Sequence, residues 1–157
     1  MYDVLDICRY IINFSNSHFS GISNLKLQKI LYFIQAFFLQ ETGNPCFNDR
    51  IEAWDFGPVV PRAYHNFKQY GAANIPSISK YLEYDENIWN VKVRDFDENI
   101  INNNDRQRIN FVLNTFADYS ATSLVDLTHN QAPWREAYIP GMNNLITLDA
   151  IRRYFNV

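Results

Sequence analysis

Apolar residues recur at helical spacing from the start of the chain. Val4, Ile7 and Ile11 fall on one side of a helix with about 3.6 residues per turn. The polar run at residues 15–18 interrupts this pattern. We therefore predict a first amphipathic helix that ends near Phe14, with residues 15–18 in a loop.

A second helix is predicted to follow. Ser23 or Asn24 can cap its N-terminus, because a short side chain with an oxygen accepts a backbone N–H that has no partner inside the helix. Gly43 predicts its end, since glycine adopts the left-handed conformation after a helix without steric cost. Apolar residues lie around most of the surface between these signals, which is typical of a central helix that others pack against.

The next segment favours an extended backbone. Residues 51–56 are rich in residues that favour strands and are followed by a Gly-Pro pair, so we expect a short strand or extended segment there. Pro61 suits the first turn of a helix and Gly71 suits its end. Together they predict a helix over about residues 62–70.

Residues 72–103 have the weakest pattern. Pro76, two serines and many Asn and Asp residues predict loops around one or two short elements. Residues 88–93 are the best strand candidate in this region, and a small sheet of two or three strands is compatible with it.

Signals for helices return near the C-terminal third. Asn104 and Gln107 fit a capping box at the start of a helix. Ser120 and Thr147 fit the N-caps of two later helices, and Pro133 fits the first turn of a helix between them.

Composition agrees with one folded domain. Hydrophobic residues make up 47% of the chain and charged residues 20%, which is typical of a globular protein with a real core. We expect a mainly α fold: a compact single-domain helical structure over residues 1–157, with a short β segment or small hairpin. We find no signal-peptide pattern and no apolar run long enough for a bilayer, so we expect a cytoplasmic protein with no membrane partner.

The charge pattern argues against a nucleic-acid partner. The net charge is −3, and the densest basic groups are Arg152 with Arg153 and Arg106 with Arg108. General affinity for DNA or RNA depends on several clustered contacts to phosphates. We therefore expect no direct nucleic-acid binding, and a mildly acidic surface would suit a basic partner.

Few residues could carry catalysis. Cys46 as a nucleophile with His129 as its base would make a small hydrolase, and this is the enzymatic alternative. Asp126 lies one helical turn before His129, but a histidine near a helix C-terminus is equally explained by the helix dipole. The chain has no zinc-ligand spacing and no glycine-rich phosphate loop. We expect no metal, no cofactor and no catalytic residues.

Aromatic residues and prolines are concentrated in residues 54–61. Trp54, Phe56 and Tyr64 lie in or just after a stretch that also holds Gly57 and two prolines. One interpretation is a rigid corner that joins a strand to a helix, with an aromatic ring packed inward. Another is a preorganised surface loop, in which prolines reduce the entropy lost when a partner binds. The two interpretations are compatible.

Three segments of the chain form an ordered set of motifs. Residues 25–36 read LKLQKILYFIQA, and residues 51–61 read IEAWDFGPVVP. Leu127-Thr128-His129 is followed by Pro133-Trp134. These motifs, in this order, resemble those of the Panacea domain of SocA-like antitoxins, which occur in bacteria and phages. The resemblance extends over about residues 4–155.

This resemblance implies a mainly α protein that neutralises a cognate protein toxin by direct binding, without catalytic residues. One member of the family is instead an adaptor that delivers its toxin to an ATP-dependent protease, which is the alternative function. We expect the partner-binding residues to lie around the second and third motifs. They are Trp54, Phe56, Gly57, Pro58, Val59, Pro61, Tyr64 and Trp134. For Trp134, anchoring its own helix to the core is the competing interpretation.

Overall fold

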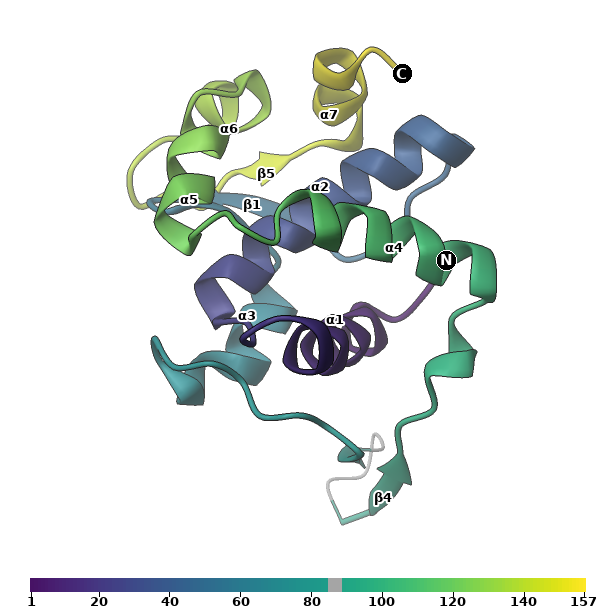
Figure 1. Cartoon of the computed structure of the whole chain (residues 1–157). Helices are drawn as coiled ribbons and strands as arrows, with labels where there is room; N and C mark the ends of the chain where they lie inside the picture. The colour runs from purple at the N-terminus through teal and green to yellow at the C-terminus, as the bar shows by residue number, and fades with distance from the viewer. Residues whose placement is uncertain (85–88) are drawn as a thin grey trace.

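The computed structural model describes residues 1–84 and 89–157 (Figure 1). Within them the chain forms seven α-helices, five short strands and two 3₁₀ turns, Lys68–Tyr70 and Glu98–Ile100. The helices are α1 (Val4–His18), α2 (Asn24–Thr42), α3 (Pro61–Phe67), α4 (Asn103–Thr115), α5 (Ala121–His129), α6 (Ala132–Ala137) and α7 (Leu148–Phe155). The strands are β1 (Ile51–Trp54), β2 (Gly57–Val59), β3 (Lys80–Tyr84), β4 (Val91–Asp95) and β5 (Leu145–Ile146). The expected mainly α fold with a small hairpin is confirmed.

Helix α2 is the centre of the fold. It runs through the middle of the molecule and packs against α1, α3, α4, α5 and α7 (Figure 1). Ser23 caps it by accepting the N–H of Lys26 at 3.3 Å, and Gly43 ends it in the left-handed conformation at φ +74°. Both predicted ends are confirmed. Because apolar residues lie all round the helix, it can be buried by neighbours on several sides.

Helix α1 is longer than its apolar pattern predicts. The expected end near Phe14 is wrong, since the helix continues through residues 15–18 to His18. Tertiary contacts explain the extension. The side-chain amide of Asn16 donates to the carbonyl of Ile75 at 3.0 Å and to the hydroxyl of Ser77 at 2.9 Å. The polar residues are therefore not a loop signal here, because they bind a segment that is distant in the sequence.

Strands β2, β1 and β5 form a three-stranded antiparallel sheet in that order. The predicted strand at 51–56 is confirmed only over Ile51–Trp54, because Asp55 and Phe56 form a turn. The Gly-Pro pair does not bound the strand as expected but begins β2, which pairs with β1. Helix α3 then begins at Pro61 and passes into the 3₁₀ turn before Gly71, close to the predicted range.

Strands β3 and β4 form a separate two-stranded hairpin that stands off the helical body at the lower end of Figure 1. The strand expected at residues 88–93 is only partly correct. Ile88 lies outside the described residues, Trp89 and Asn90 precede the strand, and β4 covers Val91–Asp95. The guanidinium of Arg9 in α1 lies 3.4 Å above the ring of Tyr81, which connects β3 to α1.

The predicted cap of α4 is wrong by two residues. Asn102 caps the helix by accepting the N–H of Asp105 at 2.9 Å, and its amide donates to the Asp105 carboxylate at 2.9 Å. This is not a capping box, because the backbone N–H of Asn102 donates to the Tyr2 hydroxyl at 3.3 Å and not to the Asp105 side chain, and Asn104 and Gln107 do not form one either. The caps at Ser120 and Thr147 and the helix start at Pro133 are confirmed.

One continuous cluster of buried side chains joins α1, α2, α4, α5 and α7 to the three-stranded sheet. The same cluster includes Ala63 and Phe67 of α3, and both β2 and α3 contact α2. Over residues 1–84 and 89–157, no helix combines the length and apolar character needed to cross a membrane.

Candidate protein-binding site

The second motif folds into a tight hairpin at one end of α2. Trp54 of β1 is paired with Gly57 of β2, and the turn between them consists of Asp55 and Phe56. Strand β2 then leads directly into α3 through Val60. The aromatic residues and prolines of the motif thus surround one corner of the fold.

Buried polar side chains of α2 fix this corner. The side-chain oxygen of Gln28 accepts the backbone N–H of Val60 at 3.0 Å, and its amide donates to Asn24 at 2.9 Å. The Asn24 amide in turn donates to the carbonyl of Tyr64 at 3.1 Å. Both side chains are almost fully buried. A buried hydrogen bond is expensive to break, so α2 holds the end of β2 and the first turns of α3 in one geometry.

Lys29 makes a second connection beneath the hairpin. Its side chain is 0% exposed, and the ammonium donates to the carbonyl of Pro58 at 3.0 Å. Burial disfavours the charged form, which lowers the pKa of Lys29 from 10.5 to about 7. The long buried side chain of Lys29, in the second turn of α2, thus reaches the backbone of β2.

Gly57 allows this close approach. Its φ is +103°, and a Cβ atom at this position would lie 2.7 Å from Cε of Lys29 and 2.8 Å from the hydroxyl oxygen of Thr128. Only glycine fits both the backbone conformation and the space. The Thr128 hydroxyl itself donates to the carbonyls of α5 at Leu124 and Val125.

The third motif supports the hairpin from behind. The indole N–H of Trp134 donates to the carbonyl of Trp54 at 2.8 Å. The Trp134 ring is stacked between His129, at a centroid distance of 4.0 Å, and Tyr138, at 4.4 Å. The hydroxyl of Tyr138 donates to Asp55 in the hairpin turn at 2.6 Å. Helix α6 is therefore tied to both the strand and the turn.

A groove of about 530 Å³ opens at this corner. We call it the corner groove. It lies between α2, the hairpin turn and α3, with further residues from the loops after α3 and before β5. Its lining is formed by Asn24, Leu25, Gln28, Trp54, Asp55, Phe56, Val59, Tyr64, Lys68, Gly71, Ala72, Gly141 and Asn143. The Trp54 and Tyr64 rings meet edge to face at 4.9 Å in its wall, and Phe56 is 66% exposed at its rim.

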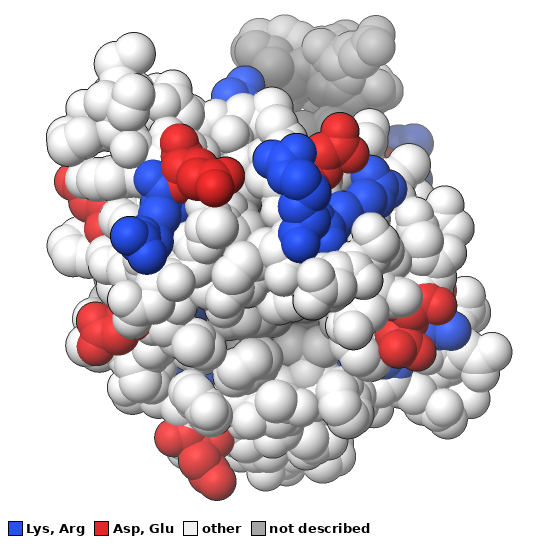
Figure 2. Space-filling model, turned by 90° about the horizontal axis from the view of Figure 1, so that it is seen from above, with Lys and Arg blue, Asp and Glu red and all other residues white. Residues whose placement is uncertain are grey.

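The groove presents mainly apolar surface to an occupant. Asn24 and Gln28 at its base already bond to the protein, so they have less capacity for a ligand. Two charges of opposite sign, Asp55 and Lys68, are among the lining residues. On the face seen from above in Figure 2, Lys and Arg likewise lie beside Asp and Glu, and the coloured residues form no broad positive area.

The structure brings half of the predicted site residues to the groove. Trp54, Phe56, Val59 and Tyr64 line it. The other four are not among its lining residues. Gly57 and Pro58 contact Lys29 from above, Pro61 begins α3, and Trp134 bonds to the strand behind the groove.

Asn24, Gln28 and Lys29 were not recognised as parts of this site from the sequence. The available signal was the presence of polar residues inside a helix that is otherwise apolar all round. Such residues are buried in this fold, so they must find partners, and their partners belong to the hairpin and α3.

The residues proposed for catalysis lack the features of an activated site. Cys46 is fully buried, its backbone N–H donates to Gln35 at 2.8 Å, and burial raises the pKa of its thiol, whereas a nucleophilic thiol needs a lowered pKa. The His129 ring is stacked on Trp134. Within the described part of the chain, no three His, Cys, Asp or Glu side chains are grouped closely enough to hold a metal ion.

Comparison with known proteins identifies the family of this chain. The model of the family described as "Antitoxin SocA-like, Panacea domain" matches residues 27–135, which include most of α2, the hairpin and the part of α6 that holds Trp134. The chain is 38% identical over 116 residues to Antitoxin SocA of Caulobacter vibrioides (strain NA1000 / CB15N), an alignment that covers 72% of this chain and 58% of that protein. The chain therefore spans less than two thirds of that relative's length. No solved structure matches it significantly. From the family match and the identity together, this chain belongs to the SocA-like antitoxins that carry the Panacea domain.

Proposed function

We propose that this chain is an antitoxin that neutralises a protein toxin by binding it directly at the corner groove. Membership of the SocA-like family supports the antitoxin role, and the relative it resembles is named an antitoxin. We place the toxin-binding site here because of the exposure of Phe56. Its side chain is a large aromatic ring, 66% exposed at the tip of a hairpin, beside an apolar groove.

The rigidity of the corner supports this proposal. Binding is weakened when loops and side chains must be ordered first, and a surface that is already fixed avoids this loss. Here Gln28, Lys29 and Trp134 hold the backbone on both sides of the exposed ring. A few aromatic anchors in such a setting usually carry most of the affinity of a protein interface.

The chemistry of the groove favours binding over catalysis. The buried polar side chains at its base bond to the protein's own backbone, and the Cys46 thiol has a raised pKa because it is buried. Nothing in the lining forms a nucleophile and base pair. An apolar recess with one exposed aromatic residue suits a toxin surface that offers a complementary apolar side chain.

The test uses the protein encoded by the gene adjacent to the one for this chain. Wild type and Phe56→Ala are each produced with it, and both growth rescue and the dissociation constant are measured. We expect Phe56→Ala to weaken binding by about 2 kcal/mol, or roughly thirtyfold, because it removes an anchor. Its melting temperature should stay near that of wild type, since the ring is mostly exposed.

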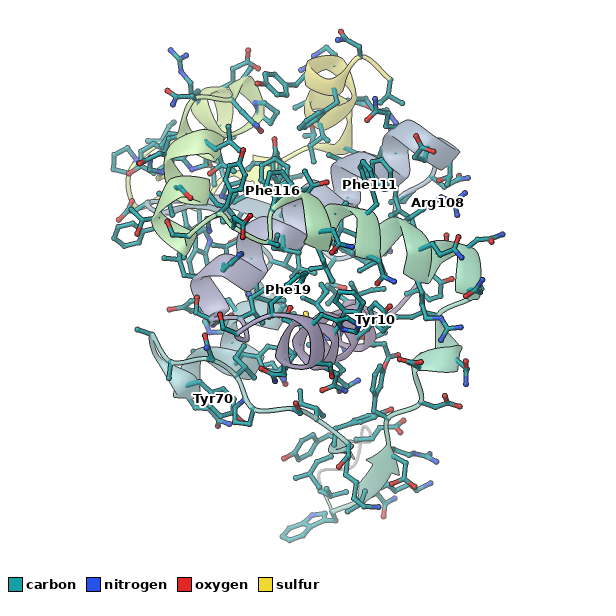
Figure 3. All side chains as sticks on the ribbon, in the orientation of Figure 1. Tyr10, Phe19, Tyr70, Arg108, Phe111 and Phe116 are labelled. Carbon is teal, nitrogen blue, oxygen red and sulfur yellow. The ribbon has the colours of Figure 1, made fainter. Side chains whose placement is uncertain are left out.

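Phe111→Ala is the matched control. Phe111 is 58% exposed and projects from α4, which contributes no residue to the corner groove (Figure 3). This variant should bind like wild type. Equal loss in both variants would contradict the proposed site, and absence of any toxic product bound by wild type would contradict the antitoxin role.

A further inference from the structure

The outer edge of β3 carries main-chain groups that do not pair with β4. In the part of the chain that the structure describes, the hairpin has two strands, and no strand lies on the outer side of β3. The N–H of Phe96 donates to the carbonyl of Ser79 at 2.8 Å, so these two residues form a hydrogen-bonded pair next to the first pair of the ladder. Hydrogen-bonded and non-hydrogen-bonded pairs alternate along an antiparallel ladder. The N–H and C=O groups of Lys80, Leu82 and Tyr84 therefore point away from β4.

This edge forms one wall of a second recess, of about 430 Å³, which we call the edge groove. Tyr81, Leu82, Glu83 and Tyr84 all line it. Successive side chains of a strand point to opposite faces, so from the four consecutive lining residues we infer that the strand edge, and not one face alone, borders the recess. The other lining residues come from the chain start, α1 and α3. They are Asp3, Leu5, Asp6, Arg9, Arg62 and Asn66.

The charges around the edge groove are already paired within the chain. Arg62 donates to both carboxylate oxygens of Asp3, at 3.0 and 3.1 Å, and Arg9 donates to Asp6 at 2.8 Å. Glu83 accepts from Arg94 at 2.6 Å. Besides these paired charges, the edge groove is bordered by the main-chain donors and acceptors of β3 that point away from β4. Their natural occupant is an extended peptide segment.

Helix α3 separates the edge groove from the corner groove. Arg62 and Asn66, one turn apart, line the edge groove, whereas Tyr64 and Lys68 line the corner groove. A protein seated at the corner groove is therefore within reach of the edge of β3. We propose that the toxin inserts an extended segment into the edge groove, where it pairs with the outer edge of β3 as a third strand. This inference rests on the proposed function.

Two physical arguments favour this occupant. A two-stranded hairpin is marginal in water, and a third strand would add ladder hydrogen bonds and neighbours for the exposed side chains of Leu82 and Tyr84. A second copy of this chain is a poorer fit. Its own β3 edge is set against α1 and α3 in the same way, so two such edges cannot approach without contact between those helices.

The main test replaces one outward N–H of β3. Leu82→Pro removes the donor and places a ring where the added strand would lie, while the inward groups that pair with β4 remain. Val93→Pro is the matched control. Val93 is paired with Leu82, so its N–H points away from β3 on the opposite edge of the same hairpin. The probe is the protein encoded by the adjacent gene, together with synthetic peptides that tile its sequence.

We expect Leu82→Pro to weaken binding of that protein, and of one peptide, about tenfold or more, with Val93→Pro within about twofold of wild type. Leu82→Ala, which keeps the N–H, should lose less than Leu82→Pro. Equal binding by wild type and Leu82→Pro would overturn the strand addition and leave the corner groove as the site. No binding by wild type would overturn both proposals.

Amide hydrogen exchange in wild type provides a second readout that does not depend on the stability of a proline variant. Formation of the complex should slow exchange at the amides of Leu82 and Tyr84, which face outward. The amides of Tyr81 and Glu83 already pair with β4, so they should change less. Unchanged exchange at Leu82 and Tyr84 in a saturated complex would overturn the proposal, whatever the variants show.

Discussion

At Gly57, both the backbone conformation and the packing of neighbouring side chains require a glycine. Its φ of +103° lies in a region that residues with a Cβ atom rarely adopt, and the space above it is filled by Lys29 and Thr128. The two constraints are separate. The first concerns the chain alone, and the second concerns three elements that come together only in the folded protein.

We expect Gly57→Ala to destabilise the fold by about 1–3 kcal/mol from backbone strain, with a further loss from the clash with Lys29. Gly43→Ala is the matched variant, because Gly43 has φ +74° but no atom within 4 Å of the added Cβ. Urea unfolding of both variants separates strain from clash. A Gly57→Ala protein no less stable than Gly43→Ala would show that the corner is loosely packed.

The elements whose ends depend on local chemistry were predictable from the sequence. Ser23, Ser120 and Thr147 cap helices because the hydroxyl oxygen of each accepts the N–H three residues later, and Gly43 ends α2 because it tolerates a positive φ. These signals need no knowledge of the rest of the chain. The cap of α4 was misplaced because Asn102 and Asn104 offer the same chemistry, and only the fold selects between them.

Elements fixed by distant contacts were not predictable in the same way. The last turn of α1 is polar, yet it stays helical because Asn16 bonds to Ile75 and Ser77. The Gly-Pro pair after β1 looks like a strand end, but it begins β2 because Lys29 and Gln28 bind the backbone there. Local propensity is a weak guide where tertiary hydrogen bonds decide the outcome.

The connection between α6 and β1 gives a prediction at this scale. Trp134→Phe keeps an aromatic ring between His129 and Tyr138 but removes the N–H that donates to the carbonyl of Trp54. We expect a loss of about 1 kcal/mol in the free energy of unfolding. Tyr138→Phe, which removes an exposed hydrogen bond to Asp55, should cost less. If Tyr138→Phe is the more destabilising change, α6 is held through the turn and not through the strand.

For the molecule as a whole, the candidate site shows how far sequence reasoning reached. The aromatic rings and prolines of residues 54–64, together with Trp134, predict a binding surface, and the structure brings Trp54, Phe56, Val59 and Tyr64 to one groove. The part that sequence reasoning missed is the support from α2. Its polar residues contact the corner only because the chain folds back, so that Lys29 and Gln28 bond to backbone groups that lie 29 and 32 positions later in the sequence.

Lys29 also affects the stability of the whole domain. Its pKa in the folded protein is lowered from 10.5 to about 7 because burial removes water from the ammonium. Between these two values the unfolded chain binds a proton that the folded protein does not. Stability therefore rises with pH across this range, by at most about 1.4 kcal/mol per pH unit. Below pH 7 both states are protonated and the contribution is constant.

The window for testing this effect is limited by the two thiols. Cys8 and Cys46 are buried, and burial raises the pKa of each, so ionisation of the unfolded thiols lowers stability above about pH 8.5. Urea unfolding of wild type and Lys29→Met is therefore compared between pH 6 and 8.5. Wild type should gain stability over the upper part of this range, whereas Lys29→Met, with an apolar side chain of similar length, should gain less. If the two proteins respond to pH in the same way, the ammonium keeps an ordinary pKa, and its bond to Pro58 would then hold a permanent charge beneath the corner groove.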